Sequence, residues 1–465
     1  MIAQVLNRGF VLDRLQEVRD HLKSAEDDRR SAGGEGPELD PGEAAEALAA
    51  ADRALEEEAR ASSGQPGFEP EEDGRRGEEP APIDDFSFFS RDPAISNLQS
   101  ALEQYFREKQ LVEEAEPDTG RRSYDDDPAV TDLSLPGVEP TRDPDGRRVF
   151  DKFSITDIRW VSSLFAMGVR RFRDRHPFPK QPAEPLRIGR QARVVIVGDW
   201  GSGLPRARKV AEEIRKVLDE GNGREQHVVH LGDVYYSGWE YEYRDRFLKY
   251  WPVRPEEKDR IRSWNLNGNH DMYAGGQAFF GHALKDERFA RQQGSSWFSL
   301  VNDDWTILGL DTAWEEHGLE GGQADWARGL LQSSPGRGLL LSHHQPWSAY
   351  EKSGGAKLRQ KIRPVLDTGR VHAWFWGHEH RCVAYGLFGD LKYGRCVGHG
   401  GVPVYLSRQQ ENPDPPIAWE FREAFRKGLE TWALFGFTVL DFDGPAIAAR
   451  YLDENGQEVW SERIG

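Results

Sequence analysis

Cysteine is almost absent from this sequence, and so is any long apolar run. The only cysteines among 465 residues, Cys382 and Cys396, lack the paired spacing of a zinc ribbon. Such low usage suits a reducing compartment. No stretch reaches the about 18 uninterrupted apolar residues of a membrane span. Charged residues between positions 13 and 17 interrupt the first apolar stretch, which is not the pattern of a signal peptide. We therefore expect a cytoplasmic protein.

Tryptophan is missing from the N-terminal third, which also has few basic residues. All 15 tryptophans lie at or after Trp160. Residues 1 to 150 carry 37 Asp and Glu against 18 Lys and Arg, a net charge of −19, whereas the remainder has a net charge of +1. The neutral remainder is therefore compatible with an anionic substrate. No basic cluster interleaved with aromatic residues occurs, which argues against long nucleic acid as a partner.

Residues 1 to 145 are predicted to form an acidic, low-complexity, partly helical extension. Apolar spacing or composition predicts helices near residues 12–22, 42–61 and 92–105. The Pro-, Gly- and acid-rich links between them bury too little to fold alone. Two interpretations stay open, a solvated and mostly disordered arm or an arm on which a protein partner docks. Because the extension has no catalytic motif, we expect a truncation starting near Thr141 to keep the chemistry.

The rest of the chain is predicted to divide into a short linker region and a catalytic domain. Residues 146 to 190 would contain an amphipathic helix at Asp157 to Arg173 that packs on the core, with a membrane-surface helix as the alternative. From residue 191 to 465 strand and helix patterns alternate. Within this domain, residues 408 to 433 are expected to form an insertion, proline-rich at first and then helical.

Five short polar motifs follow short apolar runs in this alternating region. They are Gly198-Asp199-Trp200-Gly201, Gly232-Asp233-Val234-Tyr235-Tyr236, Gly268-Asn269-His270-Asp271, Ser342-His343-His344-Gln345-Pro346 and Gly377-His378-Glu379-His380. Each alone is weak, because Gly-Asp after a strand is most often a turn. However, loops that leave the carboxyl ends of parallel strands converge on one crevice. Together their oxygen and nitrogen donors suit iron, manganese or zinc. The set predicts a two-metal site.

As a set, these motifs resemble the calcineurin-like metallophosphoesterase superfamily over residues 190 to 405. Within it they resemble the purple acid phosphatase branch, because Asp199-Trp200-Gly201 replaces the more common Asp-x-His. The resemblance implies an α/β fold, a four-layer αββα sandwich of two mixed sheets. It also implies two metal sites that share Asp233. One site would be held by Asp199, Asp233, Tyr236 and His380, and the other by Asp233, Asn269, His344 and His378.

The resemblance implies a metal-dependent phosphoesterase that hydrolyses phosphate monoesters, on small molecules or proteins, by attack of a metal-activated water. His270 resembles the family histidine that donates a proton to the leaving group, and Asp271 would orient it. The residues expected to contact substrate are Asn269, His270 and His399. Ferric iron would be stabilised by Tyr236, whereas a reducing compartment favours ferrous iron or manganese. The alternatives are a phosphodiesterase acting on nucleotides or nucleic acid, and a non-catalytic scaffold, which the complete ligand set argues against.

Two adjacent histidines, His343 and His344, compete for one ligand position. Consecutive residues at the end of a strand point to opposite faces, so only one of them should reach the metals. His344 stands two residues before Pro346, which matches the His-x-Pro form of the purple acid phosphatases. We therefore expect His344 to be the ligand and His343 to face the neighbouring layer or the substrate rim.

Overall fold

The computed structural model separates the chain into two compact units. The helical unit comprises Met1–Pro82 with Asp92–Arg170, and the sheet unit comprises Ile83–Arg91 with Arg171–Gly465. The residues that the structure describes are 5, 7–32, 41–62, 88–114, 141–142, 148–149, 158–351, 355–403, 412, 414–427 and 430–465.

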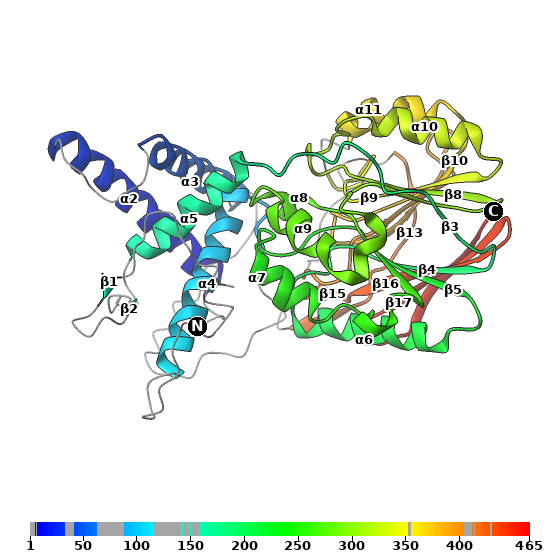
Figure 1. Ribbon diagram of the computed structural model, residues 1–465, viewed down its shortest axis with the longest axis horizontal. Helices are drawn as coiled ribbons and strands as arrows, with labels where there is room; N and C mark the ends of the chain where they lie inside the picture. Colours follow the sequence, from blue (N-terminus) through cyan, green and yellow to red (C-terminus); the bar gives the residue numbers. More distant parts are fainter. Residues whose placement is uncertain are drawn as a thin grey trace. The chain divides into compact units, whose positions relative to one another are not determined.

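Long helices dominate the helical unit. They are α2 (Arg8–Ala32), α3 (Pro41–Ser62), α4 (Pro93–Glu114) and the greater part of α5 (Ile158–Arg173), beside a two-residue pairing of β1 (Thr141–Arg142) with β2 (Arg148–Val149). Figure 1 shows these helices. The first three confirm the predicted helices. Among the described residues, no helix combines the length and the apolar character needed to cross a membrane.

Helical spacing of apolar residues explains why these segments are helices. In α2, Leu15, Val18 and Leu22 are fully buried on one face. At the start of α4, the Asp92 carboxylate accepts hydrogen bonds from the backbone amides of residues 94 and 95 at 2.8 and 3.0 Å. Pro93 follows at the first helical position, where its missing N–H costs nothing.

A six-stranded sheet forms one half of the sheet unit. Its order is β18-β17-β16-β4-β5-β6, in which β4, β5 and β6 are parallel and the other neighbours antiparallel. The strands are β4 (Ala192–Val197), β5 (Glu225–His230), β6 (Ile261–Asn265), β16 (Gly436–Asp443), β17 (Ala446–Asp453) and β18 (Glu458–Ile464). The late strands β16, β17 and β18 complete this sheet beside β4.

An eight-stranded mixed sheet forms the other half, in the order β13-β11-β12-β10-β9-β8-β7-β3. Its strands are β3 (Leu186–Arg187), β7 (Phe298–Val301), β8 (Trp305–Leu310), β9 (Arg337–Ser342), β10 (Val371–Trp376), β11 (Cys382–Tyr385), β12 (Tyr393–Val397) and β13 (Ile417–Glu420). Strands β8, β9, β10 and β12 run parallel to their neighbours in that series.

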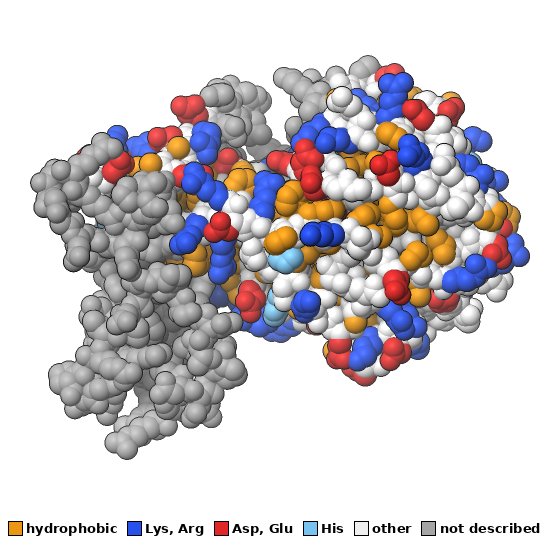
Figure 2. Space-filling model, turned by 45° about the horizontal axis from the view of Figure 1, so that its top comes forward, with side chains coloured by type: hydrophobic (Ala, Val, Ile, Leu, Met, Phe, Trp, Pro, Cys, Tyr) orange, Lys and Arg blue, Asp and Glu red, His pale blue; other side chains and the backbone are white. Residues whose placement is uncertain are grey.

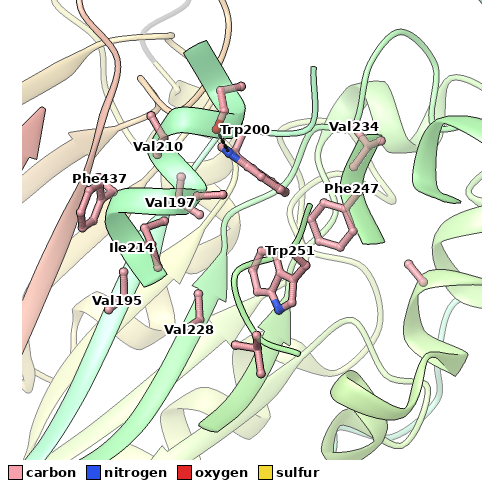
Figure 3. Close-up of a cluster of buried hydrophobic side chains, with 14 of the residues drawn as sticks. Val195, Val197, Trp200, Val210, Ile214, Val228, Val234, Phe247, Trp251 and Phe437 are labelled. Carbon is pink, nitrogen blue, oxygen red and sulfur yellow. Dashed lines mark hydrogen bonds between the residues drawn. The ribbon is translucent and has the colours of Figure 1, made fainter. Parts of the chain in front are cut away.

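Two sheets and two helical layers make the expected four-layer αββα sandwich. Alternate residues of β4 show the layering, since Val194 and Ile196 lie in the core between the sheets, whereas Val195 and Val197 lie in the core beneath α6 (Pro205–Glu220). Figure 3 shows this second core, with Trp200 and Trp251 near Phe247. On the other outer face, α10 (Gln323–Ser333) and α11 (Ala356–Leu366) cover the eight-stranded sheet (Figure 1).

Short helices occupy the loops between these layers. They are α7 (Glu240–Glu242), η2 (Tyr243–Leu248), η3 (Pro255–Glu257), α8 (Asn269–Met272), α9 (Gln277–Gly281), η4 (Ala283–Lys285) and η5 (Glu287–Gln292). Of these, α8 carries part of the third polar motif.

The predicted helical pattern within residues 408–433 is wrong. This segment instead contributes β13 to the edge of the large sheet and a separate hairpin of β14 (Ala424–Lys427) and β15 (Glu430–Ala433). The Trp419 ring of β13 stacks on Trp460 at 4.6 Å between centroids. Pairing with β11 and this aromatic contact override the helix-favouring Glu and Arg residues of the segment.

Candidate metal centre

Loops at the carboxyl ends of strands in both sheets bring the predicted ligands together. Asp199, Asp233 and Asn269 follow β4, β5 and β6, while His343 follows β9 and His378 follows β10. Because β4, β5 and β6 are parallel, as are β9 and β10, these loops leave one edge of each sheet. The two sheets face each other across a shared core, and their loops meet at that edge.

A first group of side chains consists of Asp199, Asp233 and His380. Their ligand atoms lie within 4.8 Å of one another and are buried. His380 Nε2 lies 3.5 Å from Asp199 Oδ1. The hydroxyl of Tyr235 lies within hydrogen-bond distance of all three side chains, at 3.2 Å from Asp199 Oδ1, 3.0 Å from Asp233 Oδ2 and 3.0 Å from His380 Nε2. One cation at this point would meet two carboxylates, an imidazole and a phenol.

A second group consists of Asp233, Asn269, His343 and His378. His343 Nε2 lies 3.0 Å from Asn269 Oδ1, 3.2 Å from His378 Nδ1 and 3.5 Å from Asp233 Oδ2. The other nitrogen of His343, Nδ1, donates to the Leu231 carbonyl at 2.9 Å. That bond fixes the proton on Nδ1 and leaves the Nε2 lone pair facing the group, as a metal ligand requires.

Asp233 belongs to both groups, so its carboxylate could contribute a ligand atom to each of them. The backbone is also unusual at this point. Asp199, Asp233, His378 and His380 have φ angles of 56°, 77°, 69° and 52°, a left-handed conformation that is uncommon for residues other than glycine. Strain of this kind persists only where the surrounding structure imposes it, and it is common at ligand-binding sites.

The electrostatics of the buried carboxylates fit bound cations. Burial raises the pKa of both the Asp199 and the Asp233 carboxyls, and the charge of Asp233 raises the pKa of Asp199 further. Two buried carboxylates this close are unfavourable unless a positive charge neutralises them. The surrounding imidazole nitrogens and amide and phenol oxygens form a donor set that suits iron, manganese or zinc. The residues therefore fit the expected metals.

The tyrosine whose hydroxyl meets the first group is Tyr235, one residue before Tyr236, the tyrosine that the resemblance implied. The Tyr236 ring lies 4.6 Å beneath the Arg246 guanidinium. Its backbone amide donates to Glu242 at 2.6 Å, and its carbonyl accepts from His270. The spacing of three residues after Asp233 therefore leads to the neighbour of the tyrosine whose hydroxyl meets the carboxylates.

At the two adjacent histidines, the structure again differs from the prediction by one residue. His343, which was expected to face the neighbouring layer, lies in the second group, whereas His344 lies beside it. Thr312 Oγ1 is 3.2 Å from His344 Nδ1 and accepts a hydrogen bond from the His344 amide at 3.0 Å. His344, His378 and His317 form a further cluster of three imidazoles whose ligand atoms lie within 4.8 Å of one another.

His270 and Asp271 lie at the centre, but their relation differs from the expected one. His270 Nδ1 donates to the Tyr236 carbonyl at 2.6 Å, so that carbonyl orients the ring. The Asp271 carboxylate accepts from the backbone amides of Asp233 and Gly268 at 2.8 and 2.6 Å. It therefore ties together the two loops that carry Asp233 and Asn269. Burial raises the pKa of Asp271 to about 7 and lowers that of His270.

His399 follows β12, and its ring lies beside Phe421 and Gly436. The ring lies 6.0 Å from that of Phe421, and a Cβ added at Gly436 would come within 2.7 Å of His399 Nε2. Its carbonyl accepts from the Gly436 amide at 3.0 Å. These neighbours belong to the β13 and β16 side of the unit, so His399 remains a substrate contact only by prediction.

A residue from far outside the five motifs also reaches the centre. Arg91 belongs to the sheet unit, although it precedes the first motif by more than one hundred residues. Its guanidinium donates to the His378 carbonyl at 2.7 Å. The signal in the sequence is a group of three phenylalanines at positions 86, 88 and 89, inside an otherwise acidic and proline-rich link. Apolar residues of this size rarely stand in a solvated arm.

Comparison with known families agrees with the positions of these residues. Residues 192–382 match the model of the calcineurin-like phosphoesterases. The chain carries a calcineurin-like phosphoesterase domain. Both ligand groups lie within the matched residues of this phosphoesterase domain, whereas Arg91 and the late strands β16 to β18 lie outside them.

Among known proteins, the chain is similar to tartrate-resistant acid phosphatase type 5 of Mus musculus. The identity is 24% over 310 residues, which are 58% of this chain and 90% of that phosphatase. This relative agrees with the purple acid phosphatase resemblance of the motifs.

Among solved structures, the chain shows similarity to GAP50, the anchor in the inner membrane complex of Plasmodium, and to Vps29 of Entamoeba histolytica complexed with zinc. GAP50 is 12% identical, with a TM-score of 0.45 and coverage of 59% of this chain and 89% of that chain. Vps29 is 14% identical, with a TM-score of 0.25 and coverage of 58% and 98%. Neither likeness bears on function.

Proposed function

We propose that this chain is a dinuclear metal-dependent phosphoesterase that hydrolyses phosphate monoesters. The observation that carries the proposal is the position of Asp233, which is shared by two groups of buried ligands. Asp199, His380 and Tyr235 would complete the first metal site, and Asn269, His343 and His378 the second. Two metal ions held by these residues would orient the phosphate, lower the pKa of water and neutralise charge on the attacking and leaving oxygens.

The protein's own groups supply position and proton transfer. Asp271 holds the loops of Asp233 and Asn269 together through backbone hydrogen bonds, which fixes the separation of the two sites. His270 is the proposed proton donor to the leaving group. Its Nδ1–H is engaged by the Tyr236 carbonyl, so Nε2 is the nitrogen that would deliver a proton, and it would do so from the doubly protonated imidazolium form of the ring.

A monoester is preferred to nucleic acid on the basis of surface charge. The part of the chain after residue 150 has a net charge of +1. On the face of the molecule in Figure 2, Lys and Arg side chains are interspersed with Asp and Glu around a band of hydrophobic side chains. A long nucleic acid would need a continuous basic stripe. A small phosphorylated substrate needs positive charge only at the centre itself.

The proposal is tested with the full chain, stripped with a chelator and reloaded with Mn²⁺, Zn²⁺ or Fe²⁺. We expect kcat/KM for p-nitrophenyl phosphate to exceed that for bis(p-nitrophenyl) phosphate by at least about tenfold. A reversed preference would favour the phosphodiesterase alternative. A protein that binds two metal ions but hydrolyses neither ester would favour the non-catalytic scaffold.

A further inference from the structure

The segment Phe88–Arg91 is anchored on the same loops that carry the metal centre. The Phe89 ring lies 5.3 Å from that of Tyr235, edge to face, and 5.4 Å from that of Tyr236. The hydroxyl of Tyr273, at the end of α8, donates to the Arg91 carbonyl at 2.5 Å. The ring and the backbone of this segment therefore fix the point from which the Arg91 side chain extends.

The Arg91 guanidinium is held beside the second ligand group by two partners. One nitrogen, Nη2, donates to the carbonyl of His378 at 2.7 Å, and the other, Nη1, forms an ion pair with Glu351 at 2.5 Å. Glu351 is in turn held by Gln345, whose amide donates to it at 2.5 Å. The guanidinium carries five N–H donors in a rigid fork. With 37% of its side chain still exposed, it can offer further donors to an anion that enters from solvent.

Arg91 also places positive charge beside the centre. Its guanidinium is bonded to the backbone carbonyl of His378, which belongs to the second ligand group. A cation at this position attracts an anion that binds between the ligand groups.

We propose that Arg91 binds a phosphoryl oxygen of the substrate, and that it favours dianionic monoesters over monoanionic diesters. The inference rests on the proposed function and names the residue that would set its substrate preference. In the free protein, Glu351 and the His378 carbonyl hold the guanidinium beside the second ligand group. When a phosphate binds, N–H groups of the guanidinium beyond these two bonds contact its oxygen, and the second negative charge of a monoester strengthens that contact.

The test compares Arg91→Ala, Arg91→Gln and Arg91→Lys in the full, metal-loaded chain. For Arg91→Ala we expect KM for p-nitrophenyl phosphate to rise about tenfold or more, with a smaller rise for the diester and a smaller change in kcat. Lysine, which keeps the charge but not the fork, should restore part of the affinity. Arg187→Ala is the matched control, because Arg187 is 72% exposed and pairs with Asp303 at the surface.

Calorimetric binding of inorganic phosphate to the metal-loaded protein tests the inference independently of turnover. We expect Arg91→Ala and Arg91→Gln to weaken phosphate binding about tenfold or more, while thermal unfolding shows that both variants stay folded. Unchanged phosphate affinity and unchanged KM would overturn the inference. A rise in activity would overturn it as well, because the segment would then obstruct the site. If wild-type protein binds phosphate through Arg91 yet hydrolyses no ester, the proposed function fails and the binding role stands.

Discussion

At the residue scale, the alternation of side chains along β9 decides which histidine faces the metal centre. Leu339 and Leu341 lie in the core between the two sheets, whereas Leu340 lies in the core under the outer helices. His343 continues the first series, and its Nδ1 accordingly meets the Leu231 carbonyl of the facing sheet. The sequence cannot reveal this, because three consecutive leucines fit either face equally well. The His-x-Pro spacing was the only available signal, and it favoured His344.

The first prediction concerns this pair of histidines. His343→Ala should weaken metal binding at the second site well beyond tenfold. Removing even a residue that only hydrogen-bonds to a metal ligand typically lowers metal affinity by about 10- to 100-fold. His344→Ala should keep both metal ions, because His344 lies beside Thr312 rather than within the second group. Metal analysis of the two purified variants after dialysis distinguishes them. Loss of a metal from His344→Ala alone would restore the original assignment.

Tyr235 and Arg91 are two further residues whose positions at the centre could not be predicted from the sequence. Spacing relative to Asp233 identified the right loop but not the tyrosine whose hydroxyl turns toward the carboxylates. Side-chain direction in an irregular loop has no periodicity from which to infer it. Arg91 could not be found by motif at all, because its contribution depends on a segment returning to the centre from far along the chain.

At the element scale, tight packing at glycines holds the ligand loops against one another. A Cβ added at Gly268, which directly precedes Asn269, would lie 2.0 Å from Asp233 Oδ1 and 2.7 Å from His343 Cε1. No side chain fits there without moving two proposed ligands. Four of the five motifs begin with a glycine at such a junction, which helps to explain why the motif pattern located the loops.

The second prediction follows from this contact. Gly268→Ala should displace the Asp233 carboxylate and reduce bound metal to less than one ion per chain, although its backbone conformation is acceptable for alanine. Gly329→Ala is the matched control, because this helical position in α10 has open space around it. Alanine there should leave metal binding unchanged and stabilise the fold by about 0.5–1 kcal/mol. Normal metal content in Gly268→Ala would contradict the close approach of these loops.

Most elements were predictable, because their apolar periodicity agrees with their burial. The predicted helices near residues 12–22, 42–61 and 92–105 correspond to α2, α3 and α4, and the predicted alternation of strand and helix after residue 191 is seen in β4, α6 and β5. The failure at β13 to β15 has a physical reason. Pairing with distant strands such as β11 determines the secondary structure of that segment. Local composition carries no information about a partner that is distant in sequence.

At the scale of the whole molecule, the boundary between extension and catalytic domain is not a single position. The sheet unit includes Ile83–Arg91 as well as Arg171–Gly465, with the later helices of the helical unit between them in sequence. A truncation starting near Thr141 removes Arg91 together with the arm. Such a chain can no longer be assumed to keep its chemistry, and the docking of a protein partner on the arm stays a prediction.

The central claim is that two metal ions share Asp233 in a phosphoesterase site, and one comparison tests it most directly. Metal content and p-nitrophenyl phosphate hydrolysis are measured for wild-type and Asp233→Asn protein, before and after chelation and reloading. We predict two metal ions per wild-type chain, activity that disappears on chelation and returns with metal, and a variant that binds both ions weakly with kcat reduced by more than about 100-fold. Full activity in metal-free protein, or in Asp233→Asn, would contradict the account.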